Sequence, residues 1–190
     1  MQPSGDRREL IIRQAARLFV AQGYHATGMD EIGEAAGVTG PAIYRHFTGK
    51  DDLLLAIVAA DTARAEAEVR EVYQESGSPE HLLRALVGRR VRRALTDAHL
   101  MIVAAREVGN LPPGPRLPMV RRRRLMREEW AHLVAETHPG LPDPEVRAMA
   151  EGVMALISGL VTADAGGDED RLQRLAYEAA LAALRPCGDR

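Results

Sequence analysis

The sequence has few aromatic residues, one cysteine and no long apolar run, and each shortage excludes a class of protein. Aromatic side chains make up 4% of the 190 residues, whereas hydrophobic residues make up 46%. A core of Ala, Leu, Val, Ile and Met is therefore expected, and this composition favours helix over sheet. The single cysteine, Cys187, cannot form a disulfide framework within one chain, which fits a reducing, cytoplasmic setting. No apolar run approaches the roughly 20 residues of a membrane span, and the charged N-terminus does not resemble a signal peptide.

Excess positive charge is also missing. The formal net charge is −2, and residues 1–50 hold six Lys or Arg against five Asp or Glu. Charge alone therefore does not indicate a nucleic-acid-binding protein. Any such function must rest on the geometry of a motif.

Helical periodicity recurs along the whole chain, and strand alternation is absent. Gly and Pro clusters separate the predicted helices. They lie at Gly23, Gly37, Ser76–Pro79, Gly109–Pro115, Pro139–Pro142 and Gly166–Gly167. The predicted fold is all-α, with three short helices in residues 6–47 followed by six further helices, most of them longer. We expect two domains, residues 1–50 and 51–190.

Capping-box patterns mark three of the predicted helix starts. The pairs are Asp6 with Glu9, Thr27 with Asp30, and Thr48 with Asp51. The helix after Thr48 is expected to run to about Tyr73 and a later one to begin near Leu117.

Two short predicted helices joined by Gly37-Val38-Thr39 have the spacing of a helix-turn-helix. Small residues are available where the helices cross, and apolar anchors are supplied by Ile32, Val38, Ile43 and Phe47. The second helix would then offer its outward residues to a DNA major groove. These residues are Thr39, Gly40, Pro41, Tyr44, Arg45 and His46. On spacing alone, a helical bundle with ordinary glycine turns remains the commoner explanation.

A longer set of residues in this region resembles the DNA-binding domain of the TetR/AcrR family of repressors. The matching residues are Gly23-Tyr24, Thr27, Ile32, Ala36-Gly37-Val38, Ile43-Tyr44-Arg45-His46-Phe47 and Lys50-Asp51-Asp52-Leu53-Leu54. The resemblance covers about residues 7–54 closely. The remaining two thirds agree with the family only in the number and length of helices.

The resemblance implies roles for individual residues. Phosphate contacts are expected from Thr27, Thr39, Tyr44, His46 and Lys50. The residues nearest base edges would be Gly40, Pro41 and Arg45. The family often has polar or basic residues at the first two of these positions, so apolar contact or shape readout is expected to contribute here.

The resemblance also implies a homodimer that binds a palindromic operator and is released by a small ligand. Helices 145–164 and 168–185 are the expected pairing surface because each carries a stripe of small residues. The stripes are Gly152, Ala155, Gly159 and Ala163, and Ala176, Ala179, Ala180 and Ala183. Packing of these stripes inside one subunit is the alternative.

An effector pocket is expected among the C-terminal helices, with a largely hydrophobic ligand. The candidate lining residues are Leu86, Met101, Met126, Trp130 and Met154. Ordinary core packing would explain the same residues. An acyl-CoA or fatty-acid-like ligand is one candidate, because an arginine of the basic helix, with Arg89, Arg90 or Arg93, could meet its anionic group. Residues 106–111 and the helix after them also faintly resemble fatty-acid-responsive members of the family.

The basic run Arg121–Arg124 suggests nucleic-acid binding, but four consecutive helical residues fan around the axis, so a solvated face is favoured. None of the six histidines has metal-ligand spacing, and no nucleophile or phosphate-binding glycine loop is present. No metal, cofactor or catalytic site is expected. The sequence therefore predicts a ligand-responsive transcriptional regulator, with a helical binding protein lacking DNA activity as the rival.

Overall fold

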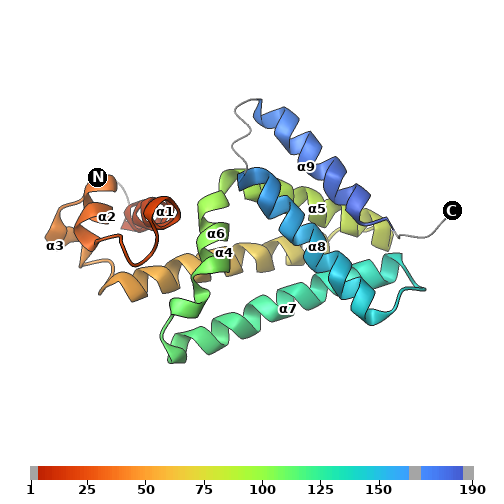
Figure 1. The fold of residues 1–190 in the computed structure, drawn as a ribbon, viewed down its shortest axis with the longest axis horizontal. Coiled ribbons are helices and arrows are strands. Elements are labelled where there is room, and N and C mark those ends of the chain that lie inside the picture. Colours follow the sequence, from red (N-terminus) through yellow and green to blue (C-terminus); the bar gives the residue numbers. More distant parts are fainter. Residues whose placement is uncertain (1–3, 163–167, 186–190) are drawn as a thin grey trace. The chain divides into compact units, whose positions relative to one another are not determined.

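The computed structural model describes residues 4–162 and 168–185, which form nine α-helices, one 3₁₀ turn and no strand (Figure 1). In chain order the elements are α1 (Ser4–Gln22), α2 (Met29–Ala35), α3 (Gly40–Ile43), α4 (Lys50–Val72), α5 (Pro79–Thr96), α6 (Ala98–Arg106), η1 (Val108–Asn110), α7 (Pro113–Thr137), α8 (Asp143–Thr162) and α9 (Glu169–Ala183). The predicted all-α class is confirmed. Cys187, Ala163 and the predicted turn at Gly166–Gly167 lie outside the described residues. Within the described ranges, no helix is long and apolar enough to span a membrane.

The chain divides into two compact units. The first contains Met1–Thr62 and His99–Arg121, and the second contains Ala63–Ala98 and Arg122–Arg190. Helices α4 and α7 contribute residues to both. Packing therefore does not divide the chain at residue 50, where the sequence analysis set the boundary.

The first unit has one hydrophobic core, which explains why it extends beyond residue 50. Fully buried side chains of α1, α2 and α3 pack with the beginning of α4 and with α6. They include Ile11, Phe19, Ile32, Ile43, Phe47, Leu53, Leu54, Ile57, Leu100 and Leu111. Full burial of one such side chain contributes about 1.5–3 kcal/mol. The α6 residues thus complete the core that supports the N-terminal helices.

The second unit is built around α5, α8 and α9, each of which packs on the other two. Ala176 and Ala180 of α9 are fully buried, so part of the small-residue stripe on this helix packs within the subunit. Ion pairs add ties between elements of this unit. Arg93 of α5 donates from Nε to Oε1 of Glu68 on α4 at 2.6 Å, and both side chains are almost completely buried.

Side chains cap the starts of α5 and α9, whereas α1 begins at Ser4, ahead of the predicted cap Asp6. The Ser78 side chain caps α5 by accepting from the His81 N–H, and Asp168 caps α9 by accepting from the N–H of Asp170. Helix α7, however, begins at Pro113 rather than near Leu117. Prolines in a first turn lose no intrahelical hydrogen bond, so this proline-rich segment opens the helix instead of delaying it.

Candidate nucleic-acid interface

Helices α2 and α3 are joined by a tight turn in which Gly37 has a left-handed conformation and Gly33 of α2 lies close to the backbone. Gly37 has φ +63°, a left-handed conformation that residues with a Cβ rarely adopt. A Cβ on Gly33 would lie 3.3 Å from the carbonyl oxygen of Val38, so α2 approaches the turn closely. The Val38 N–H donates to the Gly33 carbonyl at 2.9 Å and closes the turn. The predicted turn at residues 37–39 is confirmed.

The segment after the turn is a short helix that continues as hydrogen-bonded turns. Helix α3 ends at Ile43, and the N–H groups of His46 and Phe47 then donate to the Ile43 carbonyl at 2.9 and 3.0 Å. Ile43 is completely buried, and the Phe47 side chain is 1% exposed. These two anchors fix which side of the segment faces outward.

The opposite side of this segment is exposed to solvent. Tyr44 is 53% exposed, and Thr39, Pro41 and Arg45 are also exposed. Gly40 and His46 are half-buried. The exposed residues thus include a phenol, a guanidinium and a hydroxyl group, which suit phosphate oxygens and base edges.

Thr27 does not occupy the position that the sequence suggested. Its side chain is 2% exposed, and its hydroxyl donates to the Gly23 carbonyl at 2.8 Å. Gly28 is the residue that precedes α2, and no side chain caps this helix start. The expected capping box of Thr27 with Asp30 is therefore wrong, and the hydroxyl already has a partner inside the protein.

Lys50, at the start of α4, is bound to the loop between α1 and α2. Its ammonium donates to the carbonyl oxygens of His25 and Thr27, each at 3.0 Å, and lies 4.9 Å from the centre of the Tyr24 ring. Two of its three N–H donors are thus used within the protein. A phosphate contact by Lys50 would use the remaining donor.

Tyr24 makes a second tie between the same loop and α4. Its hydroxyl donates to the Asp51 carboxylate. Burial raises the pKa of Tyr24, and the hydrogen bond to Asp51 raises that pKa further. The capping partner of Thr48 is consequently Asp52, whose Oδ2 accepts from the Thr48 N–H at 2.9 Å, and the expected pairing of Thr48 with Asp51 is wrong.

Arg8 is a residue of this region that the sequence analysis missed. Its guanidinium lies 4.8 Å from the centre of the Phe47 ring, and the side chain is exposed. This contact holds a cation from α1 beside the end of the α3 segment. Nothing in the sequence indicates the pair, because the two residues belong to separate helical segments.

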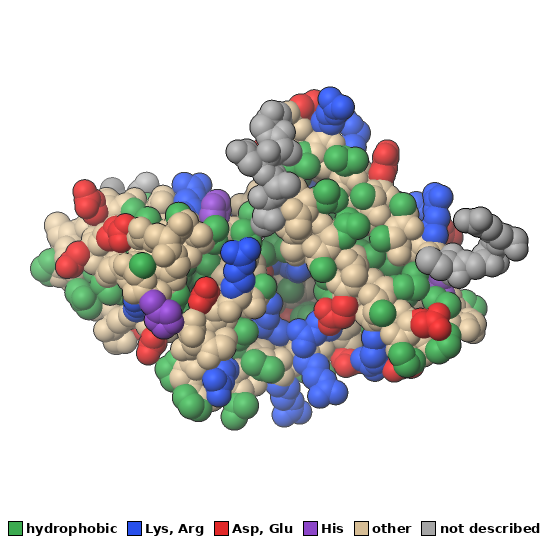
Figure 2. All heavy atoms as spheres, in the orientation of Figure 1, with side chains coloured by type: hydrophobic (Ala, Val, Ile, Leu, Met, Phe, Trp, Pro, Cys, Tyr) green, Lys and Arg blue, Asp and Glu red, His purple; other side chains and the backbone are tan. Residues whose placement is uncertain are grey.

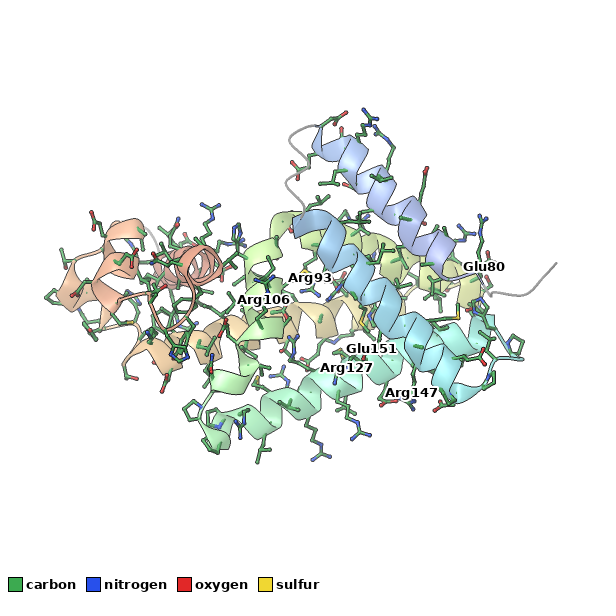
Figure 3. All side chains as sticks on the ribbon, in the orientation of Figure 1. Glu80, Arg93, Arg106, Arg127, Arg147 and Glu151 are labelled. Atoms are coloured by element: carbon green, nitrogen blue, oxygen red, sulfur yellow. The ribbon has the colours of Figure 1, made fainter. Side chains whose placement is uncertain are left out.

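The basic run on α7 is largely occupied by ion pairs. Arg122 donates from Nε and Nη2 to the two oxygens of Glu66 at 2.8 and 2.5 Å, and this pairing lowers the pKa of Glu66. Figure 3 shows Arg127 of α7 near Glu151 of α8, where Nε and Oε1 are 2.9 Å apart. Figure 2 shows further basic side chains over α7. Arg124 is exposed, and its Nε lies 3.7 Å from Oε1 of Glu128. The expected solvated face is present in part, together with these internal pairs.

The five expected pocket residues are divided between the two units, and none of them lines the cavities found among the described residues. Leu86, Met101 and Trp130 are buried, Met126 and Met154 are half-buried, and Met101 belongs to the first unit whereas the others belong to the second. Cavities of about 510, 500 and 150 Å³ are lined by other residues. Among the described residues, no group of His, Cys, Asp and Glu could hold a metal ion.

Comparisons with known proteins agree with this geometry. Residues 11–57 match the family described as bacterial regulatory proteins, tetR family. The transcriptional activator FasR of Mycolicibacterium smegmatis is 38% identical over 45% of this chain and 39% of its own length. The regulator TcmR of Streptomyces glaucescens is 29% identical over 94% of this chain and 83% of its own length. This chain thus matches only about two fifths of FasR.

Solved structures share the fold. A TetR-family regulator from Bordetella parapertussis has a TM-score of 0.81 at 20% identity, over 92% of this chain and 93% of that one. AibR, solved with isovaleryl coenzyme A and operator DNA, has a TM-score of 0.74 at 22% identity, over 91% of this chain and 97% of its own. The family match, the curated regulators and the shared fold agree: residues 11–57 resemble the bacterial regulatory proteins of the tetR family, and the chain has the fold of solved TetR-family regulators.

Proposed function

We propose that this protein is a ligand-responsive repressor that binds a palindromic operator as a homodimer. The observation that carries the proposal is the exposed side of the α3 segment, where Thr39, Pro41, Tyr44 and Arg45 stand opposite the buried Ile43. The core of the first unit includes Ile43 and Phe47, which anchor this segment. An anchored, exposed segment after a helix-turn-helix turn is the arrangement that enters a DNA major groove.

The proposed DNA contacts are of two kinds: contacts with phosphates, which position the protein on the duplex, and contacts with base edges, which distinguish sequences. Thr39, Tyr44 and His46 contact phosphates, and Arg45 with Gly40 and Pro41 lies nearest base edges. Thr27 and Lys50 act mainly by holding the loop before α2, since their polar groups are bound within the protein. Gly40 and Pro41 offer no polar side chain, so the segment relies on apolar contact and DNA shape as well as on hydrogen bonds.

Selection of duplexes from a random library tests the DNA-binding proposal. A two-fold symmetric sequence should be enriched, with half-sites separated by about one helical turn of DNA or a multiple of it. The Arg45→Ala protein should enrich a less defined sequence. A wild-type protein that enriches no sequence would support the rival function, a helical binding protein without DNA activity.

Pairing is proposed through α8 and α9. Gly152, Ala155 and Gly159 are exposed on α8, and Leu175 on α9 is 54% exposed. Small residues allow close approach of two helices, and an exposed leucine supplies apolar area to bury. Because Ala176 and Ala180 pack within the subunit, α8 supplies most of the small-residue contact.

The effector is proposed to be small and largely hydrophobic, with an acyl-CoA as the candidate to test first. AibR, which has the same fold, was solved with an acyl-CoA and operator DNA. An effector acts by binding the DNA-free arrangement more tightly than the DNA-bound one. Titration of acyl-CoA thioesters against the protein on its selected duplex should release the DNA, and release by none of them would contradict the acyl-CoA assignment.

A further inference from the structure

A groove of about 510 Å³ lies in the second unit between α5 and α9, two helices that pack on each other (Figure 1). Four arginines and one carboxylate residue line it: Arg84, Arg89, Arg92, Arg174 and Glu75. Its volume is that of a site for a small organic molecule. None of the five candidate lining residues of the effector pocket contributes to it, although Arg89, expected to meet an anionic group, does.

Two of the four arginines have carboxylate partners and two do not. Arg84 pairs with Glu80 at 3.1 Å, and Arg89 pairs with Glu75 at 2.5 Å. Over the described parts of the chain, neither Arg92 nor Arg174 forms an ion pair with a carboxylate. The groove therefore presents two guanidinium groups, one from each helix, to whatever enters it.

The remaining lining gives one side of the groove an apolar character. A Cβ on Gly88 would lie 3.6 Å from Cε2 of Tyr177 and 3.8 Å from Nη1 of Arg92, so the ring and the guanidinium flank the same point of α5. These are ordinary contact distances, and packing does not require glycine there. A glycine inside a helix costs about 1 kcal/mol relative to alanine. Its presence keeps the groove open between the ring and the cation.

We propose that this groove binds a small organic diphosphate. The phosphates contact Arg92 and Arg174, because guanidinium groups match phosphate oxygens in charge and in paired hydrogen-bond geometry. The organic part lies along Tyr177 and Ala85. Two exposed guanidinium groups on separate helices match a ligand with two or more negative charges better than a single carboxylate. This site does not depend on the proposed DNA binding.

Calorimetric titration of the full chain, without DNA, tests this proposal with ADP, pyrophosphate and adenosine as probes. ADP should bind saturably, pyrophosphate more weakly, and adenosine not at all. In the Arg92→Ala/Arg174→Ala protein the ADP affinity should fall at least about tenfold, a loss of about 1.4 kcal/mol. The matched control is Arg171→Ala, which removes an exposed α9 arginine outside the groove and should leave affinity unchanged.

A second variant separates loss of charge from loss of space. Gly88→Leu keeps every arginine but fills the groove, and it too should abolish ADP binding while circular dichroism shows an unchanged helix content. The proposal is overturned if neither ADP nor pyrophosphate saturates the protein, if adenosine binds as tightly as ADP, or if the double variant keeps the wild-type affinity. Pyrophosphate binding as tight as that of ADP would overturn the contact assigned to Tyr177.

Discussion

Lys50 illustrates how one side chain links folding to DNA binding. Its ammonium donates two hydrogen bonds to carbonyl oxygens of the loop before α2, and it lies over the Tyr24 ring. A hydrogen bond from a charged donor contributes about 1.5–3 kcal/mol when it is well shielded, and less for a half-buried group. Lys50 therefore fixes the loop from which the helix-turn-helix begins.

Replacing Lys50 by Met tests this positioning role. The variant retains the length of the side chain and loses both hydrogen bonds, so the free energy of unfolding should fall by about 1–2 kcal/mol. DNA affinity should fall as well. Urea denaturation followed by circular dichroism measures the first effect and fluorescence anisotropy the second. Unchanged stability in Lys50→Met would contradict the role.

Tyr44→Phe is the comparison for Lys50→Met, because it removes a polar group at an exposed position. Tyr44 is 53% exposed, and its hydroxyl is available to a DNA phosphate. The variant should keep the wild-type stability and lose several-fold in DNA affinity, a cost of about 1 kcal/mol. A stable Tyr44→Phe protein with full affinity would remove this hydroxyl from the interface.

Which side chains face outward in the α3 segment was predictable, because the buried Ile43 and Phe47 recur at helical spacing. The partners of Thr27 and Lys50 were not. The Lys50 ammonium donates to backbone carbonyl oxygens 23 and 25 residues away. Because every residue has a backbone carbonyl, the sequence does not indicate which of them accept. The pattern therefore identified polar residues near the interface without separating those that face outward from those that hold the loop.

At the scale of single elements, the turn between α2 and α3 depends on the left-handed conformation of Gly37. Gly37→Ala should lower the free energy of unfolding by about 1–2 kcal/mol, because a Cβ is strained at this φ. Gly37→Asn should cost less, since Asn tolerates the left-handed region. Gly109→Ala, at an exposed position with open space around it and no positive φ, is the control and should not destabilise the protein. Equal urea midpoints for the two Gly37 variants and the wild type would contradict the assignment.

The end of α4 is tied to α7 by a hydrogen bond that pH can release. Tyr73 donates to Oε2 of Glu129 at 3.1 Å, and burial, with this hydrogen bond second, raises the pKa of Tyr73 to about 12. An unfolded tyrosine ionises near pH 10. The contribution of this hydrogen bond to the free energy of unfolding is therefore fully present below pH 10 and is lost as the pH rises toward 12.

Ultraviolet absorbance of tyrosinate measures this shift directly. The difference between titrations of the wild type and of Tyr73→Phe should show one ionisation near pH 12. A difference step near pH 10 would show that the Glu129 contact does not hold in solution.

Element boundaries were predictable where a cap or a positive-φ glycine sets them, as at Ser78 and Gly37. The boundaries were not predictable where one residue type can either end a helix or begin one. The prolines before Leu117 read as a breaker, yet a first-turn proline suits the start of a helix. The groove between α5 and α9 was missed for another reason: Arg92 and Arg174 come together only through tertiary packing.

At the scale of the whole molecule, DNA binding is proposed to require two copies of the chain. Ala155→Arg places a charge on the exposed face of α8 and should convert a dimer into a monomer in sedimentation experiments, with a large loss of operator affinity. The control is Leu125→Arg, at a position on α7 that is 53% exposed and outside the proposed surface. A dimeric Ala155→Arg protein would exclude this face of α8.

The dependence of DNA affinity on salt tests the central claim most directly. Fluorescence anisotropy with the selected duplex gives the association constant between about 50 and 200 mM salt, and its logarithm should fall linearly with the logarithm of the salt concentration, by about 0.9 for each phosphate contact. Lys50→Met, which removes a cation beside the phosphates, should have a shallower slope than the wild type, whereas Tyr44→Ala removes a neutral group and should weaken binding without changing the slope. Binding that is absent, or that does not change with salt, would contradict the assignment of the exposed α3 segment as a DNA-binding surface.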